Sequence, residues 1–151
     1  MARFDGPRPP ASSAGASATG RANRRTDTRP ERLARSMLHR RGLRFRKDFP
    51  IALERRRVRP DIVFLSRKLA VFIDGCFWHC CPEHAVMPKA NRDYWEPKLR
   101  RNVERDLEVD LALEAEGWRV LRIWEHVPID EAVSQIVTAV NSASTTHEQA
   151  P

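Results

Sequence analysis

The sequence has no long hydrophobic run, and this absence argues against a membrane-spanning protein. No apolar stretch approaches the roughly 18 residues that a helix needs to cross a bilayer. Hydrophobic residues make up 41% of the chain and charged residues 31%, with a mean hydropathy of −0.57, which is typical of a soluble globular domain. The 151 residues are enough for one domain with a real core that needs no disulfide staples.

Cysteine is scarce, and the three cysteines lie close together at Cys76, Cys80 and Cys81. An odd, clustered set argues against a disulfide framework and for a reducing, cytoplasmic compartment. Large apolar residues are also scarce in the first 28 positions, so we expect no secretory signal there. We expect a disordered basic tail at 1–27, a folded domain at 28–141 and a flexible tail at 142–151.

Acidic residues are rare in the first third of the chain. Residues 1–47 hold 13 Arg and Lys against 3 Asp and Glu, whereas the remainder holds 14 against 17. A basic segment attached to a mildly acidic body indicates contact with a polyanion, most simply nucleic acid. The alternative is an Arg-rich tail that only keeps the protein soluble.

Periodicity predicts an α/β protein with a mixed sheet. Thr28 and Glu31 have the form of a capping box with Pro30 in the first turn, Leu33, Met37 and Leu38 form an apolar stripe, and Gly42 ends the helix. Alternating or continuous apolar runs predict three strands in a meander and a fourth after a long helix. The expected order is helix from 28, strands at 43–49, 61–65 and 69–74, a helix at 95–116 carrying Leu99, Val103, Leu107 and Leu111, a strand at 118–124 and a helix to about 140.

Two carboxylates mark the candidate catalytic site. Asp61 begins one predicted strand and Asp74 ends the next, so an antiparallel pair with a tight turn brings both to one end of the sheet. Such a pair forms a hard-oxygen site of the kind that Mg²⁺ prefers, although a single Asp at a strand end is usually a turn cap. His79 follows closely and could act as a general base or proton shuttle, or as a zinc ligand.

A second candidate site combines sulfur and nitrogen ligands. Cys76, Cys81 and His84 lie on one loop, and His126 at the end of the last strand would complete a Cys₂His₂ tetrahedron of the structural zinc type. The choice between Cys80 and Cys81 stays open. The alternative is a set of buried thiols and surface histidines without metal.

Large aromatic residues flank this loop, among them Phe77, Trp78 and Trp95. They could pack on the core, which is the usual fate of tryptophan. They could instead insert between base pairs, where the cost of unstacking is repaid by contacts to bent DNA.

Four blocks of sequence resemble the very short patch repair (Vsr) DNA mismatch endonucleases. They are RPDIVF at 59–64, VFIDGCFWH at 71–79, NVERD at 102–106 and GWRVLRIWE at 117–125. The resemblance covers about 28–140, and the GCFWH block is its most specific part. It implies a restriction-endonuclease-like fold of the PD-(D/E)xK type with an α-β-β-β-α-β core, a structural zinc, and Mg²⁺-dependent nicking of one strand 5′ to the T of a T:G mismatch, the product of 5-methylcytosine deamination.

The resemblance also assigns roles to individual residues. Asp61 aligns with the metal-binding aspartate, Ile73 with a backbone carbonyl ligand, and His79 and Glu31 with active-site residues. Phe77, Trp78 and Trp95 align with aromatics near the mismatch. We expect a bacterial, cytoplasmic, nucleoid-associated monomer linked to a DNA cytosine-5 methyltransferase and mismatch repair proteins.

The sequence departs from the family pattern at two sites. Asp74 stands where one branch has His, and Cys76 stands where the general PD-(D/E)xK arrangement has Lys, so Asp74 is a candidate direct metal ligand. His84 and His126 stand where that branch has cysteines. The alternatives are a related nuclease with another DNA target and a non-catalytic, zinc-stabilised DNA-binding module.

Overall fold

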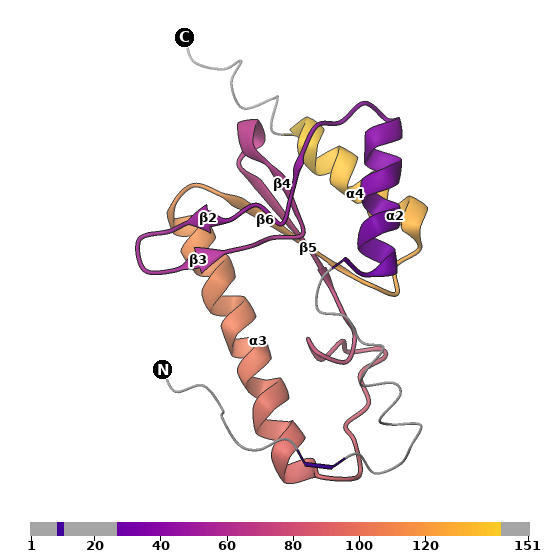
Figure 1. Cartoon of the computed structure of the whole chain (residues 1–151), viewed down its shortest axis with the longest axis vertical. Helices are drawn as coiled ribbons and strands as arrows, with labels where there is room; N and C mark the ends of the chain where they lie inside the picture. Colours follow the sequence, from indigo (N-terminus) through magenta and orange to yellow (C-terminus); the bar gives the residue numbers. More distant parts are fainter. Residues whose placement is uncertain (1–8, 11–26, 143–151) are drawn as a thin grey trace.

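The structure is a computed structural model that describes residues 9–10 and 27–142 (Figure 1). The two expected tails, at 1–27 and 142–151, otherwise lie outside the described residues. Within the described part of the chain, no helix is both long enough and apolar enough to cross a membrane.

The described part of the chain alternates short strands with three α-helices. In order, the elements are α2 (Arg29–Arg40), β1 (Arg46–Lys47), β2 (Ile51–Ala52), β3 (Arg57–Val58), β4 (Ile62–Phe64), the 3-10 turn η1 (Leu65–Arg67), β5 (Leu69–Asp74), α3 (Arg92–Ala115), β6 (Arg119–Trp124) and α4 (Ile129–Ser142).

The main sheet has four strands in the order β1-β4-β5-β6. β4 is antiparallel to both β1 and β5, whereas β6 is parallel to β5. The parallel pair is joined through α3, because parallel neighbours need a long crossover connection. The expected α/β protein with a mixed sheet is confirmed. The carboxyl ends of the parallel strands β5 and β6 lie next to each other at one end of the sheet.

Helices cover the sheet on both faces, and a core lies under each (Figure 1). On one face α2 and α4 pack over alternate residues of β4 and β5. On the other face the end of α3 and the β2–β3 hairpin pack over the intervening residues. The first core includes Leu38, Ile62, Phe64, Leu69, Val71 and Ile136, and the second Ile51, Val58, Val63, Ala70 and Leu113.

Two glycines end helices as the sequence predicted. Gly42 and Gly117 have φ of +76° and +81°, a left-handed conformation that costs a residue with a Cβ. In each case the following residue's N–H donates back to the last turn, Leu43 to the carbonyl of Leu38 and Trp118 to that of Leu113. Both are Schellman-type ends.

The predicted three-strand meander is confirmed only in part. The strand expected at 43–49 is reduced to the two residues of β1, and the residues between β1 and β4 form the β2–β3 hairpin, which was not predicted. The sequence concealed this hairpin because its strands are two residues long, with only Ile51 and Val58 buried. Two buried side chains are too few to produce a visible alternation.

The prediction of a buried apolar stripe along the long helix was wrong. Leu99 and Leu113 are buried, but Leu107 and Leu111 are 60% and 67% exposed. A spacing of four advances about 40° around a helix at each step, so a run of such residues leaves the face that contacts the core. Leu33 of α2 is likewise 42% exposed, whereas Ala34 and Leu38 are buried.

The capping box at the start of α2 also differs from the prediction. Thr28 is the N-cap and Pro30 lies in the first turn, but the Thr28 side chain makes no capping hydrogen bond. Its hydroxyl donates to Glu31 Oε1, and Glu31 Oε2 accepts from the backbone N–H of Asp27. Glu31 is therefore the acceptor at this helix end, and it is buried.

Candidate active site and metal centre

Asp61 lies at the start of β4, directly after the buried Pro60, where β4 and β5 diverge. Its Oδ2 accepts a hydrogen bond of 2.7 Å from the backbone N–H of Ile73. Burial raises the pKa of Asp61 to about 7, and the negative charges of Glu31 and Asp74 act in the same direction. No cationic side chain among the described residues forms an ion pair with this carboxylate, so its charge is uncompensated.

Asp74 ends β5 near Asp61, as the strand pairing predicted, but it has a cationic partner. Arg122 of β6 donates through Nη1 to Oδ1 and Oδ2 of Asp74 at 3.0 and 3.1 Å. Burial raises the pKa of Asp74, and the charge of Arg122 only partly opposes this rise. The two aspartates thus differ in their surroundings, since Asp74 is paired with Arg122 and Asp61 has no cationic partner.

His79 lies between two carboxylates. Its Nδ1 is 2.5 Å from Oδ2 of Asp106 on α3, and its Nε2 is 3.9 Å from Oδ1 of Asp74. Burial by itself would lower the pKa of His79, but the hydrogen bond with Asp106 and the charge of Asp74 outweigh it and raise the pKa. The arrangement fixes the ring and favours an imidazolium that can give a proton to an adjacent oxygen.

Asp61 also offers the donor chemistry expected of a divalent cation site. A desolvated carboxylate with no cationic partner is costly by itself, and a bound cation relieves that cost. Asp74, His79 and Asp106 also lie close enough together to share an ion, but Arg122 pairs with Asp74 and His79 with Asp106. Asp61 therefore fits a hard cation such as Mg²⁺ better than this group does.

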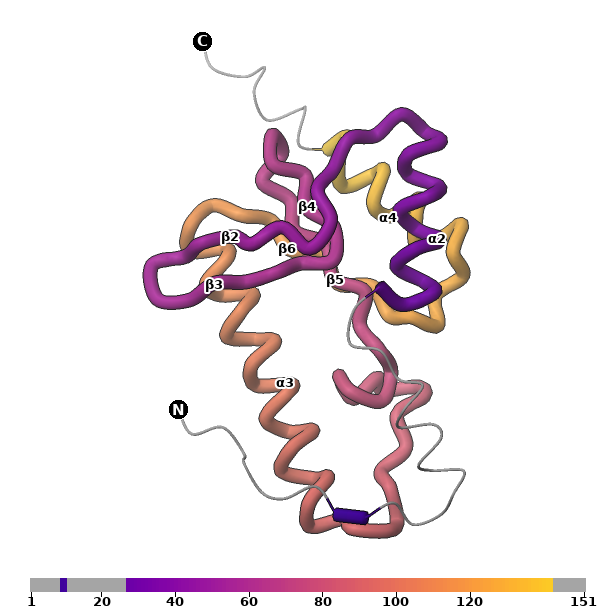
Figure 2. The backbone as a smooth tube through the Cα atoms, viewed as in Figure 1, coloured from indigo at the N-terminus to yellow at the C-terminus, as the bar shows by residue number. Residues whose placement is uncertain are grey.

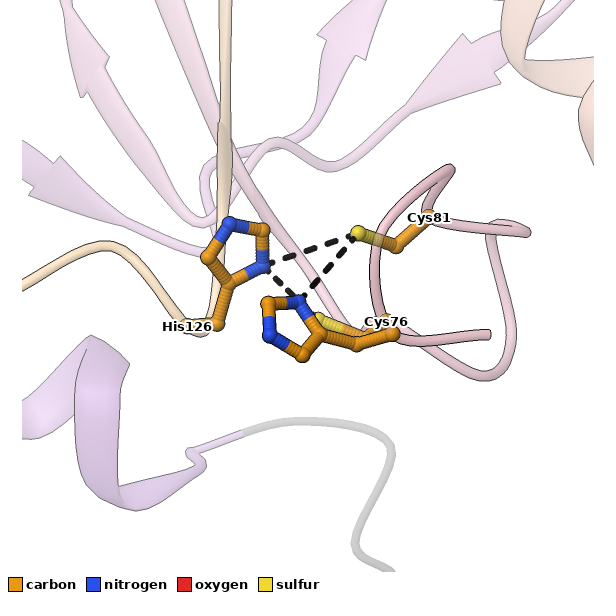
Figure 3. A group of neighbouring side chains, drawn as sticks. Cys76, Cys81 and His126 are labelled. Carbon is orange, nitrogen blue, oxygen red and sulfur yellow. Dashed lines mark hydrogen bonds between the residues drawn. The ribbon is translucent and has the colours of Figure 1, made fainter. Parts of the chain in front are cut away.

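The Cys and His residues predicted to bind zinc are brought together where the loop after β5 meets the end of β6 (Figure 3). One ligand atom from each of Cys76, Cys81, His84 and His126 lies within 4.8 Å of the others. The Sγ to Nδ1 separations are 3.2 Å for Cys76 with His126, 3.6 Å for Cys81 with His126 and 3.8 Å for Cys81 with His84. A tetrahedral zinc ion with ordinary bond lengths requires sulfur and nitrogen about 3.6 Å apart, so this group fits zinc.

The surroundings of the thiols favour Cys81 over Cys80 as a ligand. Burial raises the pKa of Cys81, but hydrogen bonds from the backbone N–H groups of Glu83 and His84 outweigh it and lower the pKa. Cys80 lies outside the four-residue group. The cluster connects Cys76, just after β5, to His126, just after β6, and the backbone N–H of Cys76 donates to Glu125.

The large aromatic side chains gather where the loop meets the start of α3. We call Phe77, Trp78, Tyr94 and Trp95 the aromatic cluster; its neighbouring ring centroids are 5.1–5.9 Å apart. All four side chains are only half-buried, and Lys98 places its Nζ 5.0–5.9 Å from three of the rings. In Figure 2 this loop and the first half of α3 run away from the sheet together.

The sequence did not predict two residues that contact His79 or Asp74. Asp106 lies in a block that resembles the family and Arg122 in a predicted strand, but neither was expected in the candidate site. Both approach His79 or Asp74 from elements that are distant in sequence, with Arg122 reaching across from the parallel strand. The one available signal was a charged residue at 122 between two apolar residues in the middle of the strand.

Comparison with known proteins settles the family. A family model described as DNA mismatch endonuclease Vsr matches residues 12–84. The type II nicking enzyme V.NaeI of Lentzea aerocolonigenes is 51% identical over 141 residues, which cover 93% of this chain and 85% of the relative. The chain belongs to the Vsr family.

Other relatives include both nicking enzymes and a mismatch endonuclease. The type II nicking enzyme V.XorIIP of Xanthomonas oryzae is 46% identical over 108 residues, covering 68% of this chain and 73% of the relative. DNA mismatch endonuclease Vsr of Escherichia coli is 36% identical over 103 residues, covering 66% and 62%. This Vsr-family chain is therefore a DNA strand-nicking endonuclease with DNA as its substrate. Membership in the Vsr family also implies the restriction-endonuclease-like fold.

Proposed function

We propose that this chain is a type II nicking enzyme that cuts one strand of duplex DNA at a target of defined local sequence, using a divalent cation held on Asp61. The observation that carries the proposal is the uncompensated, desolvated carboxylate of Asp61. It interacts with Asp74, which in turn lies 3.9 Å from His79 of the fixed His79–Asp106 pair. The name of the relative at 51% identity supports site-directed nicking over a general repair role.

In this proposal each polar residue has a separate task. Asp61 and the Ile73 backbone carbonyl hold Mg²⁺, which when bound polarises the phosphate and activates a water molecule. His79 contacts the scissile phosphate or gives a proton to the leaving 3′-oxygen, and Asp106 holds its ring in place. Glu31 and Asp74 add negative charge that strengthens cation binding. The products carry 5′-phosphate and 3′-hydroxyl ends.

The zinc ion has a structural role in the same proposal. Cys76, Cys81, His84 and His126 hold it, and it connects the loop that carries His79 to the end of β6. The loop from 75 to 91 contains no helix or strand, so a metal that cross-links it stabilises the conformation in which His79 meets Asp106.

A T:G mismatch is the second candidate target, and the aromatic cluster favours it. Phe77, Trp78 and Trp95 are half-buried rings at the end of the site, where they can insert beside a weakly stacked base pair. Unstacking costs a few kcal/mol per step and less at a mismatch. The Escherichia coli relative, whose name includes mismatch endonuclease, points the same way.

A nicking panel distinguishes these candidates. End-labelled duplexes with a T:G pair, the matched pair or a branch are incubated with Mg²⁺, and a supercoiled plasmid reports site-directed nicking of matched DNA. Cutting of the T strand in the T:G duplex alone supports the mismatch target. Cutting of matched DNA at one fixed sequence supports the assignment as a type II nicking enzyme. A chain that nicks neither substrate contradicts both.

Asp61→Ala tests the catalytic assignment. We expect this variant to lose nicking while it keeps duplex binding in a gel-shift assay, because Asp61 serves the reaction and not the docking of DNA. Equal loss of nicking and binding would contradict the role given to Asp61.

A further inference from the structure

Arg122 occupies the centre of the carboxylate group, although it lies on a strand outside the blocks that bear the predicted catalytic residues. In the parallel register of β5 and β6 it lies opposite Phe72. Its guanidinium carbon is 4.2 Å from the centre of the Phe72 ring, and its side chain is 20% exposed. The ring supports the flat face of the guanidinium, so its edges remain available for hydrogen bonds.

Both edges of the guanidinium are occupied by aspartates. Nη1 contacts both oxygens of Asp74, while Nε and Nη2 contact Asp110 at 2.9 and 2.8 Å. Nη1 also lies 3.8 Å from Oδ1 of Asp106. Asp110 anchors the guanidinium from α3, and Asp74 is the carboxylate that the guanidinium holds.

The charges explain why this cation is needed. Asp74, Asp106 and Asp110 gather in a partly buried space, and within the described residues Arg122 and His79 are the cationic partners that face Asp74. Without Arg122, the carboxylates on both sides of His79 would repel one another and turn outward. A single forked cation keeps Asp74 and Asp106 on opposite sides of the same imidazole.

We infer that Arg122 is a positioning residue of the nicking reaction. Asp110 holds the guanidinium, and the guanidinium holds Asp74 next to His79 and prevents that carboxylate from binding the metal. Asp61 is then the principal metal-binding carboxylate. This inference rests on the metal-dependent nicking proposed above. It distinguishes the two aspartates that the sequence treated as a pair.

A purely structural Arg122 would give a different result. If it only joined α3 to the sheet, its removal would lower stability, metal affinity and rate together. As a positioning residue that keeps Asp74 from the metal, its removal frees a carboxylate, so metal binding strengthens while the reaction slows. The two measurements therefore move in opposite directions.

The experiment uses the full, zinc-loaded chain with Arg122→Met, Arg122→Lys and Asp110→Asn. Arg119→Met is the matched control, because Arg119 lies on the same strand but contacts Ser142 and the carbonyl of Ala139. Binding of Mn²⁺ alone is followed by electron paramagnetic resonance of the free ion. Nicking with Mg²⁺ is measured at varied concentrations of whichever duplex the wild-type chain cuts best.

We expect Arg122→Met to lower kcat about 10–100-fold, the size typical of residues that orient a metal site. We also expect KM to change less than about threefold and Mn²⁺ affinity to rise severalfold. Arg122→Lys keeps the charge but not the forked guanidinium, so its Mn²⁺ affinity stays near wild type and its kcat lies between those of the wild type and Arg122→Met. Asp110→Asn lowers kcat severalfold, and Arg119→Met leaves kcat and Mn²⁺ affinity unchanged.

If Arg122→Met does not fold, Arg122→Lys and Asp110→Asn carry the test. Variants whose kcat matches that of Arg119→Met, or whose Mn²⁺ affinity and rate fall in step with the folded fraction, overturn the inference. A wild-type chain that binds no Mn²⁺ would instead count against the proposed metal site, so the two failures are distinguishable.

Discussion

At the scale of single residues, Asp61 is the position where the proposed metal-binding function conflicts with stability. In the metal-free chain its pKa is raised to about 7, chiefly by burial. A carboxyl whose folded-state pKa is raised binds its proton more tightly in the folded than in the unfolded chain. Its contribution therefore lowers the free energy of unfolding as pH rises from about 4 to about 7, and the loss is constant above that range.

We predict that Asp61→Asn stabilises the metal-free chain at pH 8 by about 1–3 kcal/mol, a figure reduced for partial exposure. The amide keeps an oxygen that can accept from Ile73 but carries no charge. Urea unfolding of the zinc-loaded chain in magnesium-free buffer measures the difference.

The same comparison at pH 4 gives the internal control, because there the wild-type carboxyl is mostly protonated and the gain shrinks. Glu114→Gln, at an exposed site on α3, serves as the matched control and changes little at either pH. A variant less stable than wild type at pH 8 would mean that Asp61 is stabilised by contacts and not destabilised by desolvation.

Several site residues could be predicted from the sequence because they follow one another along the chain. Cys76, Cys81 and His84 share one loop, and Asp61 and Asp74 border two adjacent strands. Arg122 could not be predicted, because its contacts depend on the parallel register of β5 and β6, and local sequence carries no signal of that register.

At the scale of elements, the β5–α3 loop is the segment that the proposed zinc ion would stabilise. Backbone hydrogen bonds close its first turns, from His79 to Gly75 and from Cys81 to Cys76, but few buried apolar residues hold it. The proposed zinc ion on the Cys and His side chains would therefore contribute much of the stability of this loop.

We predict that Cys81→Ser and His126→Ala lower zinc content and melting temperature together, because each removes one of four ligands. Zinc is measured by elemental analysis and unfolding by circular dichroism. Cys80→Ser is the matched control, since Cys80 is outside the cluster, and it leaves both unchanged. Full stability after exhaustive chelation would show that no structural zinc is bound.

The end of α3 offers a second test at this scale. We predict that Gly117→Ala lowers the free energy of unfolding by about 1 kcal/mol, because alanine is strained at positive φ. Gly42→Ala at the end of α2 has the same sign of φ and nothing within 4 Å of the added Cβ, so a similar loss there assigns the effect to backbone conformation. Denaturant melts of both variants provide the comparison.

Helix ends were predictable for the same reason, since a glycine at positive φ is specified locally. The outward faces of α3 were not predictable. Leu107 and Leu111 carry an apolar spacing, but the sheet contacts only the end of the helix near Leu113 and does not reach them. Which part of a long helix is covered depends on the length of the sheet beneath it.

At the scale of the whole molecule, charge governs the encounter with DNA. The chain has a formal net charge of +7, and residues 1–26 contribute five Arg against one Asp. Phosphate contacts by such residues release counterions, so affinity for duplex DNA falls steeply with salt.

We predict that a chain beginning at residue 27 binds duplex DNA more weakly and with a shallower salt dependence than the full chain. Fluorescence anisotropy from 50 to 200 mM salt measures both slopes, and each lost phosphate contact reduces the slope by about 0.9. Replacing the five Arg by Gln in the full chain controls for length. Identical slopes for all three proteins would assign DNA docking to the folded part alone.

The two cores lie under the helices, whereas the proposed site lies at the carboxyl ends of β5 and β6 and on the loop that follows. Mutations that reshape this loop or the first turns of α3 therefore leave the packing of the sheet intact. Such a division lets a lineage change what it cuts without rebuilding what makes it fold, and one scaffold can diversify into enzymes with separate targets at little risk to its stability.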